Sequence, residues 1–247
     1  MPIALPFQRR PAAISPWTDT QPARAEIFGL ERLEEHARSL AAAQSVVDGS
    51  RGRNRLSARL VDNAAVLLGC YRSLAAAMDE QRPVTAAAEW LIDNYHLVER
   101  QIRAIRSDLP PGYYRQLPKL TSGPFAGYPR VLGMAWAFVA HTDSHFNPQM
   151  MARFVRADRQ VQPLTIGELW AVSITLRFVL IENLRRLAES ITAQRAAQSQ
   201  ADAMADRLLG HDGAAPEPLG AVLATVNNLP LAEGFAVQLV HRLRGDA

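Results

Sequence analysis

An all-α fold, built as a multi-helix bundle or an α-solenoid-like stack, is the class that this sequence predicts. Ala, Leu and Arg, which lose little on entering a helix, are abundant, whereas aromatic residues make up only 7% of the chain. Apolar residues recur at intervals of three and four, the spacing of amphipathic helices. An apolar fraction of 48% in 247 residues is enough to bury a core.

The domain organisation predicted from the sequence has three parts. Residues 1–22 contain five prolines and little apolar periodicity, so they are expected to form a disordered leader. Residues 23–210 are expected to form the helical domain. Residues 211–247 begin with a linker and continue as C-terminal helices of a following part, which we expect to be truncated at Ala247.

Three amphipathic helices are predicted first, at residues 23–47, 56–78 and 85–107. The first two are expected to pair as a hairpin. Thr85 can cap the third helix, and the two prolines at residues 110–111 end it.

A long connection rich in Pro, Gly and Tyr is predicted at residues 110–129. Loops of this length are usually functional or packed by their own aromatic side chains. Six aromatic residues in and beyond it suit either a sugar-stacking platform or ordinary packing, and packing is favoured: Tyr113, Tyr114, Phe125, Tyr128, Trp136 and Trp170.

The remaining helices are predicted from their caps. Asn147 and Pro148 suit the start of a short helix, after another short helix at residues 130–141. Thr165 and Glu168 form a capping box that opens a long helix reaching about residue 209. Two more helices are predicted at residues 219–228 and 231–244.

A polar seam is predicted on the third helix. Glu89, Asp93 and His96 lie at i, i+4 and i+7 and so project from one side. They could form half of a metal site in a bundle, but the chain offers no partner helix with a Glu-x-x-His motif, so a structural seam is favoured and no metal site is expected.

Three further residues, His141, Asp143 and His145, lie two apart around a predicted helix end. This spacing is weak evidence for zinc, because further ligands would have to come from elsewhere in the chain. A polar helix terminus is the favoured interpretation.

Several other function classes lack support in the sequence. No Gly-x-Ser-x-Gly elbow or phosphate-binding glycine loop is present, and no catalytic residue is assigned. The formal charge of +3 does not indicate nucleic-acid binding. Arginines lie three or four positions from acidic residues, as in Glu99 and Arg103, which is the spacing of ordinary ion pairs on a helix surface. With one cysteine, Cys70, and no signal peptide or apolar run of membrane-spanning length, a reducing, cytoplasmic setting is expected.

Four long stretches resemble the N-terminal region of the cyclic β-1,2-glucan synthase family. They lie at residues 26–44 (EIFGLERLEEHARSLAAAQ), 89–120 (EWLIDNYHLVERQIRAIRSDLPPGYYRQLPKL), 127–148 (GYPRVLGMAWAFVAHTDSHFNP) and 161–189 (VQPLTIGELWAVSITLRFVLIENLRRLAE). Together they cover most of the chain that is expected to be ordered.

The resemblance implies a parent protein of the bacterial inner membrane. Such a protein joins a membrane glycosyltransferase, which uses UDP-glucose and a divalent cation, to a phosphorylase-like glycoside hydrolase region. No residue here matches their catalytic motifs. The leading interpretation is therefore a non-catalytic helical module on the cytoplasmic face of that membrane, with the transferase region of the same polypeptide as partner and β-1,2-glucan as a further candidate.

On this interpretation, five residues are the candidates for contact with sugar or with the transferase: Tyr113, Tyr114, Arg115, Lys119 and Arg130. Aromatic faces and guanidinium groups on a loop suit glucan hydroxyls or a partner's carboxylates.

Two alternatives to the non-catalytic module stay open. The first is a glucan-binding or catalytic domain that uses Glu89, Asp93 or Glu168, although these carboxylates are predicted on helices that look buried. The second is a membrane-surface adaptor that acts through the arginine cluster at residues 51–59.

Overall fold

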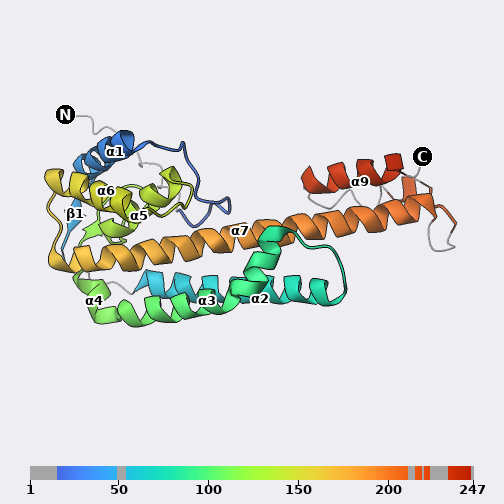
Figure 1. Cartoon of the computed structure of the whole chain (residues 1–247), viewed down its shortest axis with the longest axis horizontal. Coiled ribbons are helices and arrows are strands. Elements are labelled where there is room, and N and C mark those ends of the chain that lie inside the picture. The colour runs from blue at the N-terminus through green and yellow to red at the C-terminus, as the bar shows by residue number, and fades with distance from the viewer. Residues whose placement is uncertain (1–15, 49–53, 211–214, 219, 223–232, 246–247) are drawn as a thin grey trace, which may run out of the picture. The chain divides into compact units, whose positions relative to one another are not determined.

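The structure, a computed structural model, describes residues 16–48, 54–210, 215–218, 220–222 and 233–245. Its helices are α1 (Leu30–Ala43), α2 (Arg55–Asp79), α3 (Ala86–Asp108), α4 (Pro111–Gln116), α5 (Arg130–His141), α6 (Pro148–Val161), α7 (Ile166–Leu209) and α9 (Glu233–Gly245) (Figure 1). Two-residue strands β1 (Val46–Val47) and β2 (Lys119–Leu120) pair antiparallel. The predicted all-α class is confirmed. Within the described residues, none of the helices combines the length and apolar character needed to cross a membrane.

Two compact units divide the chain. Unit 1 comprises Met1–Val66 and Asn94–Arg186, and unit 2 comprises Leu67–Asp93 and Leu187–Ala247. Helices α2, α3 and α7 each contribute residues to both. Each unit therefore combines two segments that are distant in sequence, and the domain boundary expected at residue 210 stays a prediction.

The core of unit 1 forms where α1 packs on α6 and α5 (Figure 1). Leu33 and Ala37 on α1 are fully buried, as is Phe154 on α6. The ring of Phe154 meets that of Phe138 on α5 edge to face, at 5.7 Å between centroids. Burial of each such ring contributes about 2–3 kcal/mol to folding.

Residues 16–29 form an extended segment, here called the N-terminal strap. Helix α1 therefore begins at Leu30 and not at residue 23 as predicted, because backbone groups of the strap bond to unit 1 in place of a helix. Ala23 N donates to the side chain of Asn183 at 2.6 Å, and Ala25 N donates to Ala140 O at 3.0 Å. Part of the expected leader is thus fixed on the bundle, while residues 1–15 lie outside the described residues.

The connection at residues 110–129 has more regular structure than predicted. It contains α4 and β2, and strand β2 pairs with the chain that follows α1. Gly127, whose φ of 80° favours glycine, turns the chain so that its N–H donates to Leu120 O at 2.7 Å. The connection is thus a structured part of unit 1.

The predicted caps are confirmed. Thr85 Oγ1 accepts a bond from Ala88 N, and Asn147 Oδ1 accepts from two backbone N–H groups at the start of α6. At the start of α7, Glu168 N donates to Thr165 Oγ1 while Thr165 N donates to the Glu168 carboxylate, which is a complete capping box.

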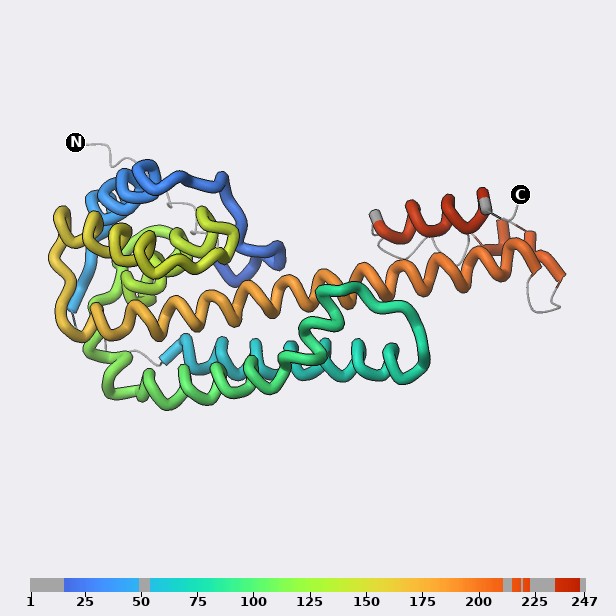
Figure 2. The backbone as a smooth tube through the Cα atoms, viewed as in Figure 1, coloured from blue at the N-terminus to red at the C-terminus, as the bar shows by residue number. Residues whose placement is uncertain are grey.

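In unit 2, α9 lies beside the second half of α7 (Figure 2). Phe235 is buried against the small residues Ala197 and Ala201. Gln238 and Arg242 donate to aspartates of α7 at the edges of this contact. The helix expected at residues 219–228 lies mostly outside the described residues, although 220–222 are helical.

Candidate functional site

Three of the five predicted contact residues are buried. Tyr114, Lys119 and Arg130 are 2%, 2% and 4% exposed, so their side chains bind within unit 1 and present no surface to a partner. Tyr113 is half-buried and donates its hydroxyl to Gly167 O at 2.5 Å. Arg115 is exposed.

Lys119 joins the loop to α4. Its ammonium donates to Tyr114 O and to Leu117 O at 2.6 Å, and it lies 4.2 Å from the centre of the Tyr114 ring. Burial lowers the pKa of Lys119 to about 8, although the Glu168 carboxylate opposes this. Lys119 therefore closes the C-terminal end of α4, where carbonyl groups lack helical partners.

Arg130 and Glu168 form a buried ion pair between α5 and α7. Arg130 Nε lies 2.5 Å from Glu168 Oε1, and Nη2 lies 2.9 Å from Oε2 and 2.6 Å from Pro163 O. Asp158, 1% exposed, lies near this pair, and burial raises its pKa to about 6 against the opposing influence of Arg130. Within the described residues, Arg130 Nη1 and Asp158 Oδ1 have no hydrogen-bond partner.

A second buried carboxylate, Glu182 on α7, binds two arginines. Arg59 of α2 donates to both of its oxygens at 2.7 and 2.8 Å, and Arg186 donates at 2.9 Å. Burial alone would raise the pKa of Glu182, but these hydrogen bonds outweigh it and lower the pKa. Arg186 also donates to the strap carbonyls of Pro16 and Gln21 at 2.6 and 2.8 Å.

Neither of the two polar clusters found in the sequence forms a set of metal ligands among the described residues. Glu89, Asp93 and His96 are all exposed on α3. At the end of α5, His141 stacks on a strap residue and Asp143 pairs with Arg24 at 2.9 Å. Among the described residues, no group of three or more His, Cys, Asp or Glu side chains could hold a metal ion.

The arginine cluster is only partly described. Arg51 and Arg53 lie outside the described residues. Arg55 lies over the Tyr128 ring at 5.7 Å, and Arg59 is held by Glu182. Arg59 is thus bound to unit 1, and among the described members only Arg55 has an exposed side chain for an anionic surface.

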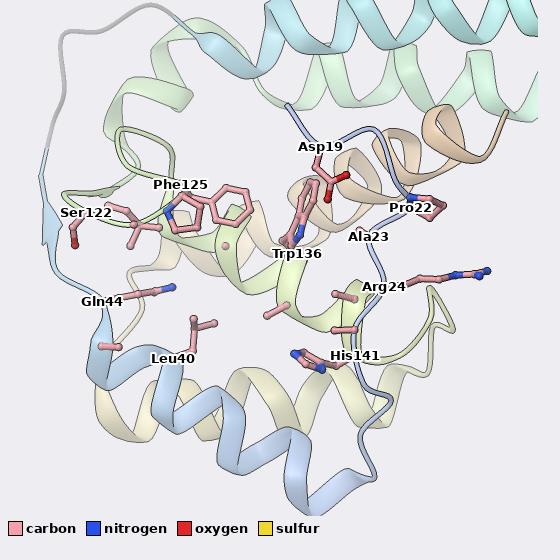
Figure 3. Close-up of a pocket in the computed structure, with 18 of the residues that line it drawn as sticks. Asp19, Pro22, Ala23, Arg24, Leu40, Gln44, Ser122, Phe125, Trp136 and His141 are labelled. Atoms are coloured by element: carbon pink, nitrogen blue, oxygen red, sulfur yellow. The ribbon is translucent and has the colours of Figure 1, made fainter. Parts of the chain in front are cut away.

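A pocket of about 460 Å³ opens in unit 1 between α1, α5, the strap and the loop after β2 (Figure 3). Its walls include Trp136 and Phe125, whose rings lie 5.3 Å apart, and its polar groups include Asp19, Gln44 and Ser122. We call it the strap pocket. Of the aromatic residues predicted as a platform or as packing, Phe125 and Trp136 line this pocket.

An exposed apolar surface lies on α6 and the first half of α7, beside a groove of about 420 Å³. Ile166 and Trp170 recur at i and i+4 on one face of α7, and each is 71% exposed. Leu169 and Val172, on a different face of α7 from Trp170, line the groove opposite Met151 and other residues of α6. We call this the α6–α7 surface.

Several of these residues were not singled out in the sequence. Trp17 lies in the expected leader but makes edge-to-face contacts with Phe125 and Trp136. Asp19 and Gln44 carry no motif. The sequence offers two signals for the missed residues. One is a lone tryptophan in a proline-rich stretch, and the other is a Glu-x-x-x-Arg pair at 182 and 186 within an apolar helix.

A curated bacterial protein is similar in sequence to this chain. The chain is 39% identical over 188 residues, 76% of its length, to the cyclic β-(1,2)-glucan synthase NdvB of Rhizobium meliloti (strain 1021). It spans about 6% of the length of that curated relative. No family model matches the chain. This identity, over more than two thirds of the chain, shows that the chain belongs to the cyclic β-(1,2)-glucan synthase family.

Proposed function

We propose that this chain is a non-catalytic docking module of a cyclic β-1,2-glucan synthase. It binds another segment of the synthase polypeptide through the α6–α7 surface, and it supports glucosyl transfer from UDP-glucose by a transferase region outside it. UDP-glucose and its divalent cation bind that region, and the module lies on the cytoplasmic face of the inner membrane.

The exposure of Trp170 is the observation that carries the docking role. Large contiguous apolar surfaces are uncommon on proteins that act alone, and tryptophans dominate the energetics of interfaces. Ile166, also 71% exposed, extends the apolar area on the same face. Because the relative is far longer than the chain, a partner segment within the same polypeptide is the natural occupant.

The positive charge around the groove indicates that the docked partner segment carries acidic residues. Arg156 and Arg159 line the groove beside its apolar floor, and both are exposed. A helix or loop with apolar anchors and flanking carboxylates would complement both features.

The arrangement of carboxylates favours a non-catalytic role. Glycoside chemistry generally uses two carboxyl groups that face each other across an open cleft. Glu168 and Glu182 are 0% exposed and bound to arginines, and Asp19 is the only carboxylate among the described residues that line the strap pocket.

Binding to membrane vesicles that contain the synthase without this segment tests the proposal. The purified chain should bind such vesicles and not vesicles lacking the synthase. Trp170→Ala should weaken binding about 10- to 30-fold, because a buried interface tryptophan contributes about 2 kcal/mol. Trp90→Ala, which removes an exposed indole from α3, is the matched control and should bind as the unmodified chain does.

Two results would overturn the proposal. One is equal binding by vesicles with and without the synthase. The other is transfer of glucose from UDP-glucose by the purified chain alone, which would make it an enzyme.

A further inference from the structure

The strap pocket has the composition of a site for a neutral, polyhydroxylated ligand. Its volume of about 460 Å³ falls in the range of small-molecule sites. It combines an aromatic wall with a few polar groups, contributed by α1, α5, the strap and the loop after β2 (Figure 3). All of these elements belong to unit 1.

The aromatic wall suits the C–H faces of sugar rings. Trp136 projects from α5 and has the Arg186 guanidinium over its ring at 4.9 Å, and Phe125 comes from the loop after β2. Trp17 of the strap packs its ring edge to face against both, at 5.7 and 6.5 Å, which holds the two rings in place. An aromatic face carries partial negative charge that attracts the polarised C–H bonds of a pyranose.

Gln44 supplies an acceptor that the fold leaves unused. Its Oε1 is buried, and no group in the described part of the chain donates to it. The amide lies against Gly133 of α5, where a Cβ would come within 3.4 Å of Nε2. Buried acceptors are normally satisfied, and a hydroxyl donor in the pocket would satisfy this one.

The charges of the pocket favour a neutral ligand over an anionic one. Arg186 donates to Glu182 and to two strap carbonyls, and Arg24 pairs with Asp143, so both guanidinium groups are already bound. The Asp19 carboxylate is exposed at the rim, where it can accept hydroxyl hydrogen bonds and would repel a diphosphate.

We infer that the strap pocket binds a glucosyl unit of a β-1,2-linked glucan, with Trp136 and Phe125 against the ring and Gln44 and Asp19 accepting from its hydroxyls. The choice of this glucan rests on the proposed function. The pocket would hold a stretch of glucan close to the module while the docked transferase acts.

Isothermal titration calorimetry of the 247-residue chain with β-1,2-linked glucose oligosaccharides of two to five units is the test. The chain should bind them with a Kd in the millimolar range or below, and it should bind UDP-glucose at least 10-fold more weakly. Saturation of the heat signal at one site per chain is expected.

Variants locate the binding in the pocket. Ala43→Trp should weaken binding at least 10-fold, because Ala43 is exposed on α1 where it lines the pocket and an indole there would fill it. Ala42→Trp, one residue earlier, exposed and not among the lining residues, is the matched control and should keep full affinity. Gln44→Leu preserves the volume, removes the acceptor and should weaken binding about 5-fold.

The inference fails if the unmodified chain shows no binding at 10 mM oligosaccharide, or if Ala43→Trp and Ala42→Trp bind equally well. It also fails if UDP-glucose binds as tightly as the oligosaccharides. These outcomes are separate from the docking test, because the vesicle assay contains no oligosaccharide and depends on Trp170. Docking without sugar binding would remove only the inference, and sugar binding without docking would remove only the proposed function.

Discussion

Helix α7 carries two buried carboxylates that differ in how fully they are paired. Glu182 accepts hydrogen bonds from Arg59 and Arg186, and Arg186 in turn binds the strap. Glu168 pairs with Arg130 but lies near Asp158, whose Oδ1 has no partner within the described residues. The first cluster fixes distant segments of the chain, whereas the second leaves a buried carboxylate oxygen without a hydrogen bond from the described residues.

The difference reflects the cost of burying charge. An ion pair in the interior repays desolvation only when its geometry is good and its remaining groups are bonded. Around Glu182 this condition is met, and the pKa of its carboxyl is lowered. Around Glu168 the neighbours Lys119 and Asp158 have pKa values of about 8 and about 6, both displaced toward the neutral form by burial.

The largest expected effect comes from breaking the Glu182 cluster. Glu182→Gln removes the carboxylate charge that binds the partly buried Arg59 and the fully buried Arg186, so we expect the free energy of unfolding to fall by about 3–5 kcal/mol. Urea denaturation followed by circular dichroism measures it. Glu99→Gln, which breaks the exposed pair with Arg103, is the control and should change stability by less than about 0.5 kcal/mol. Equal effects of the two substitutions would show that the buried cluster is not stabilising.

A smaller loss is expected at the Glu168 cluster. Arg130→Met removes the partner of Glu168, yet the carboxylate keeps its bonds to Thr165 N and Oγ1 in the capping box. We expect a loss of about 2–3 kcal/mol in urea denaturation, below that of Glu182→Gln. Adding Glu168→Leu to Arg130→Met should restore part of this loss, because the buried carboxylate that lost its guanidinium partner is then removed as well. A double variant less stable than Arg130→Met would contradict this account.

The smallest effect is a gain in stability. Burial raises the pKa of Asp158 from its ordinary value of 3.8 to about 6. The folded state therefore binds this proton more tightly, and the contribution is present below about pH 4 and lost as the pH rises through about 6. Asp158→Asn should thus stabilise the chain by about 1–3 kcal/mol at pH 7.5.

The pH dependence checks the sign of that prediction. The difference in unfolding free energy between Asp158→Asn and the unmodified chain should grow from pH 4 to pH 6.5 and then stay constant up to about pH 7.5. A difference that shrinks over this range would mean that Asp158 is stabilised as the carboxylate, for instance by Arg130.

Local features of the fold were predictable because they depend on neighbouring residues. Asn147, Thr165 and Glu168 define helix starts through bonds to groups two or three positions away, and the apolar periodicity gives the helix class directly. The start of α1 was misplaced because residues 23–29 bond to α5 and α7 instead of forming a helical turn.

The candidate sites depend on distant residues and were mostly not predictable. Arg59 and Glu182 are 123 positions apart, and Arg186 meets Pro16 across 170 positions. The sequence singled out Lys119 and Arg130 as candidate contacts for sugar or the transferase, but whether such a cation points outward or into a core is decided by tertiary packing. The contact role predicted for them stays a prediction that their burial does not favour.

The binding of the strap by Arg186 has a consequence for how this protein can be subdivided. A fragment that started at Ala23, the limit suggested by the proline-rich leader, would lose the carbonyls of Pro16 and Gln21 and the indole of Trp17. Two guanidinium donors would then face a gap, and Trp136 would lose the ring packed against it. A fragment of unit 1 that keeps these contacts must therefore include Pro16, within the stretch that composition alone marks as a disordered leader.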